Sequence, residues 1–540
     1  MKISKKVLSL IIVSTMILSV GCSLKSNNIQ SNTTTIENKS INAKDKGKYS
    51  EETIEFDLGN ETYTSDYGKE MPYKLRGVIS VPKGEGKFPI VLITHGSHNN
   101  EKTGVRFDTG FKYLTQKLAE NGYIAVSIDA QNAYVWSYGD NDDYIKVPVM
   151  MDKHIQKLRD ANDGKEKGYS IDLKDKIDFE KMALVGHSRG GETIFRIAEQ
   201  EEVKGQKISA MLSIAPTMSL EDTPYSQTDI PTSIVMGEYD GDVITYDGIG
   251  IYDKLDTEKR QSPISLAFLE KANHNYFNDN IKINDADILI YDVNDQLSKE
   301  RQENFLANYG LDFFNATLKN EVNKSVYDTK TTSPNKMYGE KVKTLYKDKN
   351  TKSIASVEST KEYKSEGVTI EATQDSWFYK YDKLQPVDTA THGVKETSAR
   401  KLLTMKWEKL DSKVSFEPAE KDFEKYNSIS LNLLQDPSDK LNKKDENQQF
   451  TIQIKDKKGN TSNVELDKNV TSLDYKEGNI STIEIEGKIY ETWNKITPVT
   501  ELRIPLASFK GIDLKNIQEV SLIFNKTQSG SIIVSDFSLK

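Results

Sequence analysis

The chain has 540 residues, of which 29% are charged and 36% hydrophobic, and its formal net charge is −9. This length predicts two to four domains, and this composition is typical of a globular protein with enough apolar side chains for large cores. The acidic balance argues against a nucleic-acid partner, because net negative charge repels polyanions. The single cysteine, Cys22, excludes a disulfide framework and a cysteine-rich metal site.

Residues 1–21 have the pattern of an export signal. Three lysines precede an apolar run over residues 7–20, which is too short for a comfortable membrane span. Ser19-Val20-Gly21-Cys22 follows and resembles the lipobox of bacterial lipoproteins, with Leu18 one place earlier than the usual leucine. The resemblance implies that Cys22 carries fatty acyl chains such as palmitate. Lipid would then be the only membrane attachment, on the extracytoplasmic face of a bacterial cell membrane. The alternative is an ordinary signal peptide with an incidental cysteine.

Residues 22–50 are rich in Ser, Asn, Thr and Lys, and this composition predicts a disordered tether. Over residues 51–320, short apolar runs then alternate with helical patterns, which predicts a mostly parallel sheet covered by helices on both faces. Expected strands cover residues 78–81, 90–94, 123–130, 182–185, 210–215, 233–236 and 264–269. Expected helices contain Phe111 to Leu118, Met151 to Leu158, and residues 296–318.

The most specific motif follows the expected strand 182–185 and precedes a helical pattern. It reads Gly186-His187-Ser188-Arg189-Gly190-Gly191. In a strand–turn–helix context, G-x-S-x-G predicts a nucleophile elbow that exposes Ser188 at the positive end of a helix. The glycines let strand and helix approach closely. The alternative is a glycine-rich turn with a capping serine.

A serine nucleophile needs a base and an acid. The chain has six histidines: His95, His98, His154, His187, His274 and His392. Of these, His274 directly follows the last expected strand of the sheet, which is where the order Ser, acid, His would put the base. Asp240 and Asp242 follow the strand 233–236, and either carboxylate could hold the imidazole tautomer.

The same chemistry needs an oxyanion hole. One backbone N–H is expected from Arg189 at the start of the helix. The other is expected from Ser97, in the loop His95-Gly96-Ser97 after strand 90–94. The alternative is that His95-Gly96 is only a tight turn.

Together these segments resemble the α/β-hydrolases, and more narrowly the serine esterases related to dienelactone hydrolase, chlorophyllase and platelet-activating-factor acetylhydrolase. The resemblance covers about residues 73–318. It implies a mostly parallel sheet of eight strands and an acyl-enzyme mechanism without metal or organic cofactor. It also favours Asp240 over Asp242 as the acid, because the family acid commonly stands three residues after the glycine that ends the strand.

Residues 321–353 are polar and predict a linker with little structure. In residues 354–540 apolar residues alternate with polar ones and no long helix is indicated, which predicts an all-β sandwich. Its last strands resemble jelly-roll, carbohydrate-module domains. Trp377, Trp407 and Trp493 could stack on sugars or belong to the core.

The sequence therefore predicts a surface-anchored serine hydrolase that cleaves a small or polymer-borne carboxylic ester. The predicted site consists of Ser188, Asp240 and His274, with the N–H groups of Ser97 and Arg189. Two alternatives stay open: a peptidase or amidase that uses the same triad, and a non-catalytic carbohydrate-binding lipoprotein.

Overall fold

The computed structural model describes residues 31–37, 40–43, 47–139, 142–219, 223–289, 292–322, 326–376, 399–437, 439–476, 479–485, 488–495 and 497–540. The predicted export signal, Cys22, Trp377 and His392 lie outside the described residues.

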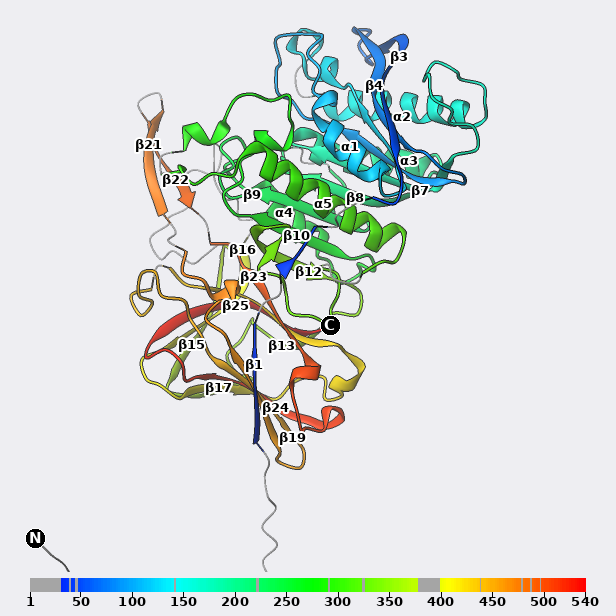
Figure 1. The fold of residues 1–540 in the computed structure, drawn as a ribbon. Helices are drawn as coiled ribbons and strands as arrows, with labels where there is room; N and C mark the ends of the chain where they lie inside the picture. The colour runs from blue at the N-terminus through cyan, green and yellow to red at the C-terminus, as the bar shows by residue number, and fades with distance from the viewer. Residues whose placement is uncertain are drawn as a thin grey trace, which may run out of the picture.

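One large sheet runs through the N-terminal two thirds of the chain (Figure 1). Its strands are β2 (Ser40–Ile41), β3 (Glu51–Thr64), β4 (Glu70–Pro82), β5 (Phe88–Thr94), β6 (Ile124–Ile128), β7 (Ile177–His187), β8 (Ile208–Ile214), β9 (Thr232–Gly237), β10 (Ile264–Leu269), β11 (Lys336–Met337) and β12 (Glu340–Lys347). They lie in the order β2-β11-β12-β10-β9-β8-β7-β5-β6-β4-β3. The block from β10 to β6 is parallel, whereas β12, β4 and β3 pair antiparallel with their neighbours. The sheet thus has eleven strands rather than the eight that the resemblance implies.

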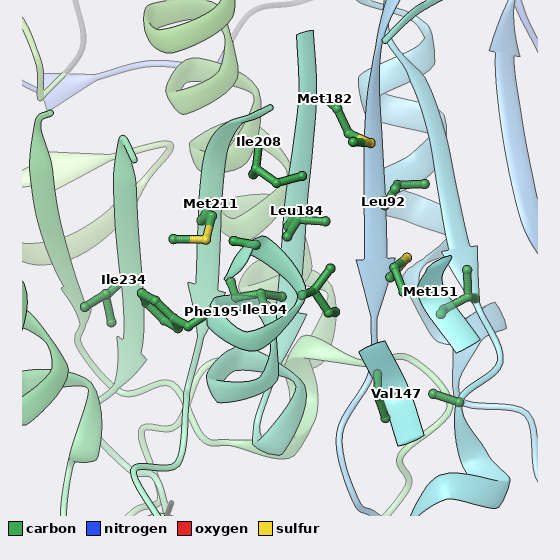
Figure 2. Packing of buried hydrophobic residues seen from close by; sticks show 14 of the residues in the cluster. Leu92, Val147, Met151, Met182, Leu184, Ile194, Phe195, Ile208, Met211 and Ile234 are labelled. Atoms are coloured by element: carbon green, nitrogen blue, oxygen red, sulfur yellow. The ribbon is translucent and has the colours of Figure 1, made fainter. Parts of the chain in front are cut away.

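Over the residues that the structure describes, five α-helices accompany this sheet: α1 (Lys112–Ala119), α2 (Asp143–Asn162), α3 (Arg189–Val203), α4 (Asp247–Leu255) and α5 (Lys299–Leu318). Successive strand side chains point to opposite faces, so Ile90 and Leu92 join the core under α2, α3 and α4, while Val91 and Ile93 join the core under α1 and α5. Figure 2 shows the first core, where Phe195 of α3 lies over the sheet. Burial on both faces explains why the parallel strands are nearly continuous apolar runs.

The C-terminal part consists of β-sheets. Its strands are β13 (Lys352–Ala355), β14 (Tyr363–Glu366), β15 (Val368–Ser376), β16 (Ala399–Trp407), β17 (Ser412–Phe416), β18 (Ser428–Gln435), β19 (Thr451–Asp456), β20 (Thr461–Leu466), β21 (Asn479–Ile485), β22 (Lys488–Lys495), β23 (Thr500–Pro505), β24 (Ile517–Phe524) and β25 (Gly530–Leu539). One sheet has the order β15-β16-β25-β18-β23, with β13 also on β25. The other contains β20-β19-β24-β17-β14, and β21 pairs with β22 as a separate hairpin. The two larger sheets share one apolar core, as a sandwich does.

Trp407 belongs to that core. Its side chain is 1% exposed, its ring stacks 4.0 Å from that of Phe524, and its indole N–H donates to the carbonyl of Thr527 over 3.1 Å. The idea that Trp407 stacks on sugars is therefore wrong. A carbohydrate partner for this part of the chain stays a prediction.

Two segments expected to lack structure contain strands. Ser31–Ile36 forms β1, which pairs in parallel with β20 at the edge of the sandwich, so these residues of the expected tether are ordered. In the expected linker, β12 pairs antiparallel with β10, and β13 joins the sandwich. The edge strand β1 needs only a few apolar side chains, such as Ile36, and β12 buries the polar side chains of Lys343 and Thr344, so composition alone reveals neither strand.

The sandwich also contacts the large sheet through ion pairs. The Lys476 amine lies 3.2 Å from the carboxylate of Glu238 and 2.9 Å from that of Glu270. Glu238 directly follows β9, so this contact lies beside the turn that carries Asp240. In the part of the chain that the structure describes, no helix is long and apolar enough to span a membrane.

Candidate active site

Ser188 occupies a strained turn between β7 and α3. Its backbone angles are φ 58° and ψ −128°, a region that side-chain-bearing residues rarely adopt. The turn is so tight that a Cβ atom on Gly186 would lie 2.1 Å from the carbonyl oxygen of Gly190. Only glycine fits there, and the Ser188 side chain therefore projects from the turn as a nucleophile elbow requires.

The loop after β5 lies directly against this serine. A Cβ atom on Gly96 would lie 2.5 Å from Ser188 Cβ and 3.1 Å from Ser188 Oγ. His95 Nε2 accepts from the N–H of Ala130 over 3.0 Å, so its Nδ1 carries the proton and donates to the Gly96 carbonyl over 2.8 Å. The C=O of Gly96 and the N–H of Ser97 belong to one planar peptide and point in opposite directions. His95 therefore fixes the orientation of the Ser97 N–H.

The predicted base and the predicted acid are in direct contact. His274 Nδ1 lies 3.0 Å from Asp240 Oδ2, and both side chains are buried. The second Asp240 oxygen accepts from the N–H groups of Asp242 and Val243, over 3.1 and 2.7 Å, which fixes the carboxylate in its turn. Asp242 instead lies on the opposite edge of the imidazole, 3.6 Å from Nε2, with a side chain that is 53% exposed. The structure thus brings Asp240, and not Asp242, to Nδ1.

The charges around His274 raise its basicity. Burial alone favours the neutral imidazole, but the charge and hydrogen bond of Asp240, followed by the charges of Asp242 and Asp285, outweigh it and raise the pKa of His274 to about 9. Nε2 has no hydrogen-bond partner among the described residues. This nitrogen is therefore the atom left to exchange a proton with a nucleophile or a leaving group.

Two further histidines pack beside His274. The His187 ring lies 4.8 Å from the His274 ring, and His187 Nε2 donates to the His274 carbonyl over 3.1 Å. The His187 ring therefore holds the loop that carries His274 next to the elbow. The His98 ring stacks 5.0 Å from that of His187. Burial, and then the neighbouring imidazoles, hold the pKa values of His98 and His187 well below the usual range, so both rings are neutral.

The side chains around the elbow also fix its helix and loop. Arg189 Nε donates to Asp143 at the start of α2 over 2.9 Å, which ties α3 to α2. The Tyr134 hydroxyl donates to the carbonyl of His95 over 3.0 Å, so this aromatic residue supports the loop after β5. His154 is buried against Phe56, with ring centroids 5.9 Å apart, and therefore takes a packing role.

Sequence reasoning missed one buried carboxylate, Asp285. It accepts hydrogen bonds from the N–H groups of Gly241 and His274, and thus connects the acid turn with the base turn. No motif marks this position in the sequence. As to metal binding, no cluster of three or more His, Cys, Asp or Glu side chains suited to a metal ion occurs within the described ranges.

Comparison with known proteins finds a matching family and a distant relative. The chlorophyllase family matches residues 39–236, a segment that includes Ser97 and Ser188 and ends before Asp240. A cutinase of Thermobifida alba, cutinase est2, is 23% identical over 205 residues, which are 38% of this chain and 58% of that protein. The chain thus spans less than two thirds of the length of this relative. These similarities support an ester hydrolase of the α/β-hydrolase type.

Proposed function

We propose that the protein is a serine esterase that cleaves carboxylic esters through an acyl-enzyme on Ser188. The observation that carries the proposal is the strained turn at Ser188, which contacts Gly96. The ring of the preceding residue, His187, lies 4.8 Å from the His274 ring, which Asp240 holds by hydrogen bond. An unstrained turn would pack equally well at this position and would cost less conformational free energy, so packing does not explain the strained backbone of Ser188. Its value is that it directs the hydroxyl out of the turn, although the residue is only 3% exposed.

The proposed reaction has two halves. Ser188 Oγ attacks the ester carbonyl carbon while His274 Nε2 takes the hydroxyl proton, and the N–H groups of Ser97 and Arg189 hold the resulting oxyanion. When the C–O bond to the alcohol breaks, His274 returns that proton to the leaving oxygen. A water molecule, deprotonated by His274, then attacks the acyl-enzyme, and the acid leaves as Ser188 Oγ is reprotonated. Throughout, Asp240 keeps the imidazole oriented and stabilises its protonated form.

The first test is a substrate panel. Purified protein is assayed on p-nitrophenyl esters of increasing acyl length, on an insoluble polyester and on peptide p-nitroanilides, next to Ser188→Ala. We expect ester hydrolysis that the variant loses, and little cleavage of the anilides. Cleavage of anilides as fast as esters would favour a peptidase, and equal ester hydrolysis by both proteins would exclude the proposed mechanism.

We further propose that Cys22 anchors the enzyme to the extracytoplasmic face of the membrane. The support is the sequence Ser19-Val20-Gly21-Cys22 after the apolar run. Because β1 begins only a few residues later, at Ser31, and belongs to the sandwich, a lipid on Cys22 would keep the sandwich close to the membrane. Labelling of cells with an alkyne analogue of palmitate tests this: the label should enter the membrane-bound protein and should be lost in Cys22→Ala.

A further inference from the structure

The acid turn and the base turn follow neighbouring parallel strands, β9 and β10, and lie against each other. The N–H of Tyr239 donates to the carbonyl of Ala272 over 2.7 Å, and a Cβ atom on Gly237 would lie 2.5 Å from the same oxygen. These contacts join the beginnings of the two turns. They do not reach the later residues of the two turns, Asp240 and His274.

Asp285 provides that connection. Its Oδ2 accepts from the N–H of Gly241 over 2.8 Å and from the N–H of His274 over 2.9 Å, while its Oδ1 accepts from the N–H of Asn275 over 2.9 Å. One carboxylate thus holds the residue after the acid and the base itself. Hydrogen bonds from N–H groups to an ionised oxygen are shorter and stronger than those between neutral groups.

The surroundings of Asp285 fit a fixed role. The side chain is 6% exposed, and a Cβ atom on Gly241 would lie 2.1 Å from the Asp285 carbonyl oxygen, so the two backbones touch. Asn284 caps the short 3-10 turn Asp285–Ile288 and accepts from the side chain of Asn273, next to the base. The segment that carries Asp285 is therefore attached to the base turn at two successive residues.

Asp285 differs from both other carboxylates near the base. Asp240 contacts the Nδ1 edge of the His274 imidazole and Asp242 lies beside the Nε2 edge, whereas Asp285 bonds to backbone N–H groups. It is thus placed to set where the imidazole stands and to add negative charge close to it, without taking the place of the triad acid. Burial, and next the charge of Asp240, raise the pKa of the Asp285 carboxyl above its ordinary value.

We propose that Asp285 is a positioning residue for the catalytic base. Its carboxylate joins the Asp240 turn to the His274 turn by hydrogen bonds, and it thereby fixes the position of the imidazole relative to Ser188. This inference rests on the proposed esterase function. A displacement of about 1 Å at a reacting group can cost on the order of 100-fold in rate, so loss of the clamp should appear in kcat rather than in KM.

The groups that face His274 determine how its titration should respond. They are the carboxylates Asp240, Asp242 and Asp285 and the neutral rings of His187 and His98. Replacing Asp285 by Asn removes one of three negative charges, so the midpoint of the His274 titration should fall. A residue that served only to stabilise the loop would not move that midpoint.

The experiment compares Asp285→Asn and Asp285→Ala with Asp287→Asn in the full chain. Asp287 is a matched control, because it is exposed, stands in the same 3-10 turn and accepts from the Asn284 side chain rather than from the triad turns. Each protein is assayed for kcat and KM on a p-nitrophenyl ester across pH. The His274 ring is titrated by NMR with labelled histidine, and thermal unfolding reports stability.

For Asp285→Asn we expect a fall in plateau kcat of about 10- to 100-fold with KM nearly constant, together with a lower His274 midpoint. Asp285→Ala should lose more, because the three N–H groups then lack their acceptor. Asp287→Asn should match the parent protein within about twofold. The proposal is overturned if Asp285→Asn folds and keeps both the kcat and the midpoint of the parent, even with a lower unfolding temperature. If the parent protein hydrolyses no ester, the proposed function fails, while the NMR titration still decides whether Asp285 acts on His274.

Discussion

Ser188 is held by the turn of its own backbone, whereas Asp240 and His274 stand on two turns that a third residue, Asp285, joins through its side chain. The serine stands in a strained turn whose glycines, Gly186 and Gly190, allow the strand and the helix to touch. The acid and the base stand on two separate turns that meet through hydrogen bonds to Asp285.

Because of this difference, the serine half of the site depends on few segments of the chain, whereas the acid–base half depends on several segments that are far apart in the sequence. The elbow needs only the continuous segment β7–α3 and the loop at Gly96, and the strands that carry them, β7 and β5, are neighbours in the middle of the sheet. The acid–base half needs β9 and β10, the 3-10 turn at Asp285, and strand β12, which covers β10. We therefore expect changes in distant parts of the chain to disturb the acid–base half first.

The largest effect is expected from truncation. A chain that ends at Glu321 loses β12, and the edge of β10 with Leu266 and Phe268 becomes unpaired. It also loses Lys476, which forms ion pairs with Glu238 and Glu270. We expect such a protein to be mostly insoluble and inactive, measured by soluble yield and by ester hydrolysis.

A chain that ends at Asn350 is the control for this truncation, because it keeps β12. It should recover part of the soluble yield. If the shorter protein were as soluble and as active as the full chain, the acid–base half would not depend on the C-terminal strands.

The next effect concerns the nucleophile. Ser188→Ala should lower kcat by roughly a million-fold while the unfolding temperature stays close to that of the parent protein, because the triad acts as a unit and the hydroxyl adds little to the fold. Steady-state kinetics on a p-nitrophenyl ester and thermal unfolding measure both quantities. Residual activity within about tenfold of the parent would assign the reaction to another group.

A smaller effect separates the two carboxylates that the sequence left open. Asp240→Asn should lower kcat by about 10,000-fold, because Nδ1 loses the acceptor that fixes its tautomer. Asp242→Asn should cost less than about tenfold at high pH, because this exposed carboxylate lies near Nε2 and makes no contact with Nδ1. Kinetics of both variants at pH 9 to 10 compare them, and the reverse ranking would assign the acid role to Asp242.

The smallest effect is a pH dependence. His274 must be neutral to accept a proton, and its pKa is raised to about 9, so most of it is protonated at pH 7. The kcat/KM should therefore rise about tenfold per pH unit up to about pH 9 and then level off. The profile of Asp242→Asn should level off at a lower pH, since one negative charge near the imidazole is gone. A parent profile that is flat from pH 7 to 9 would contradict the raised pKa.

The parallel core of the fold could be predicted from the sequence because its strands are buried on both faces. Runs such as residues 182–185 and 264–269 are almost wholly apolar, and they coincide with β7 and β10. Two other strands could not be predicted: β1 is an edge strand that buries only alternate side chains, and β12 buries Glu340, Lys343 and Thr344, which are polar and do not mark a buried strand in the sequence. Composition then predicts a tether and a linker where the structure has strands.

The same reasoning applies to the candidate site. Ser188 and the loop at Gly96 carry local signatures, since a strand–turn–helix motif constrains consecutive residues. Asp285 carries none: its role depends on three N–H groups from two other turns, and such a convergence is visible only in three dimensions. The position of the His187 ring was also missed, because the sequence does not show that the base loop folds back over the residue before the nucleophile.

The most direct test of the central claim is covalent capture of the nucleophile. The full chain is treated with a fluorophosphonate probe, digested, and its peptides are mapped by mass spectrometry. We predict a single phosphonylated residue, Ser188, and loss of labelling in Ser188→Ala and after unfolding. Labelling at another residue, or no labelling of a protein that hydrolyses esters, would contradict the proposed mechanism.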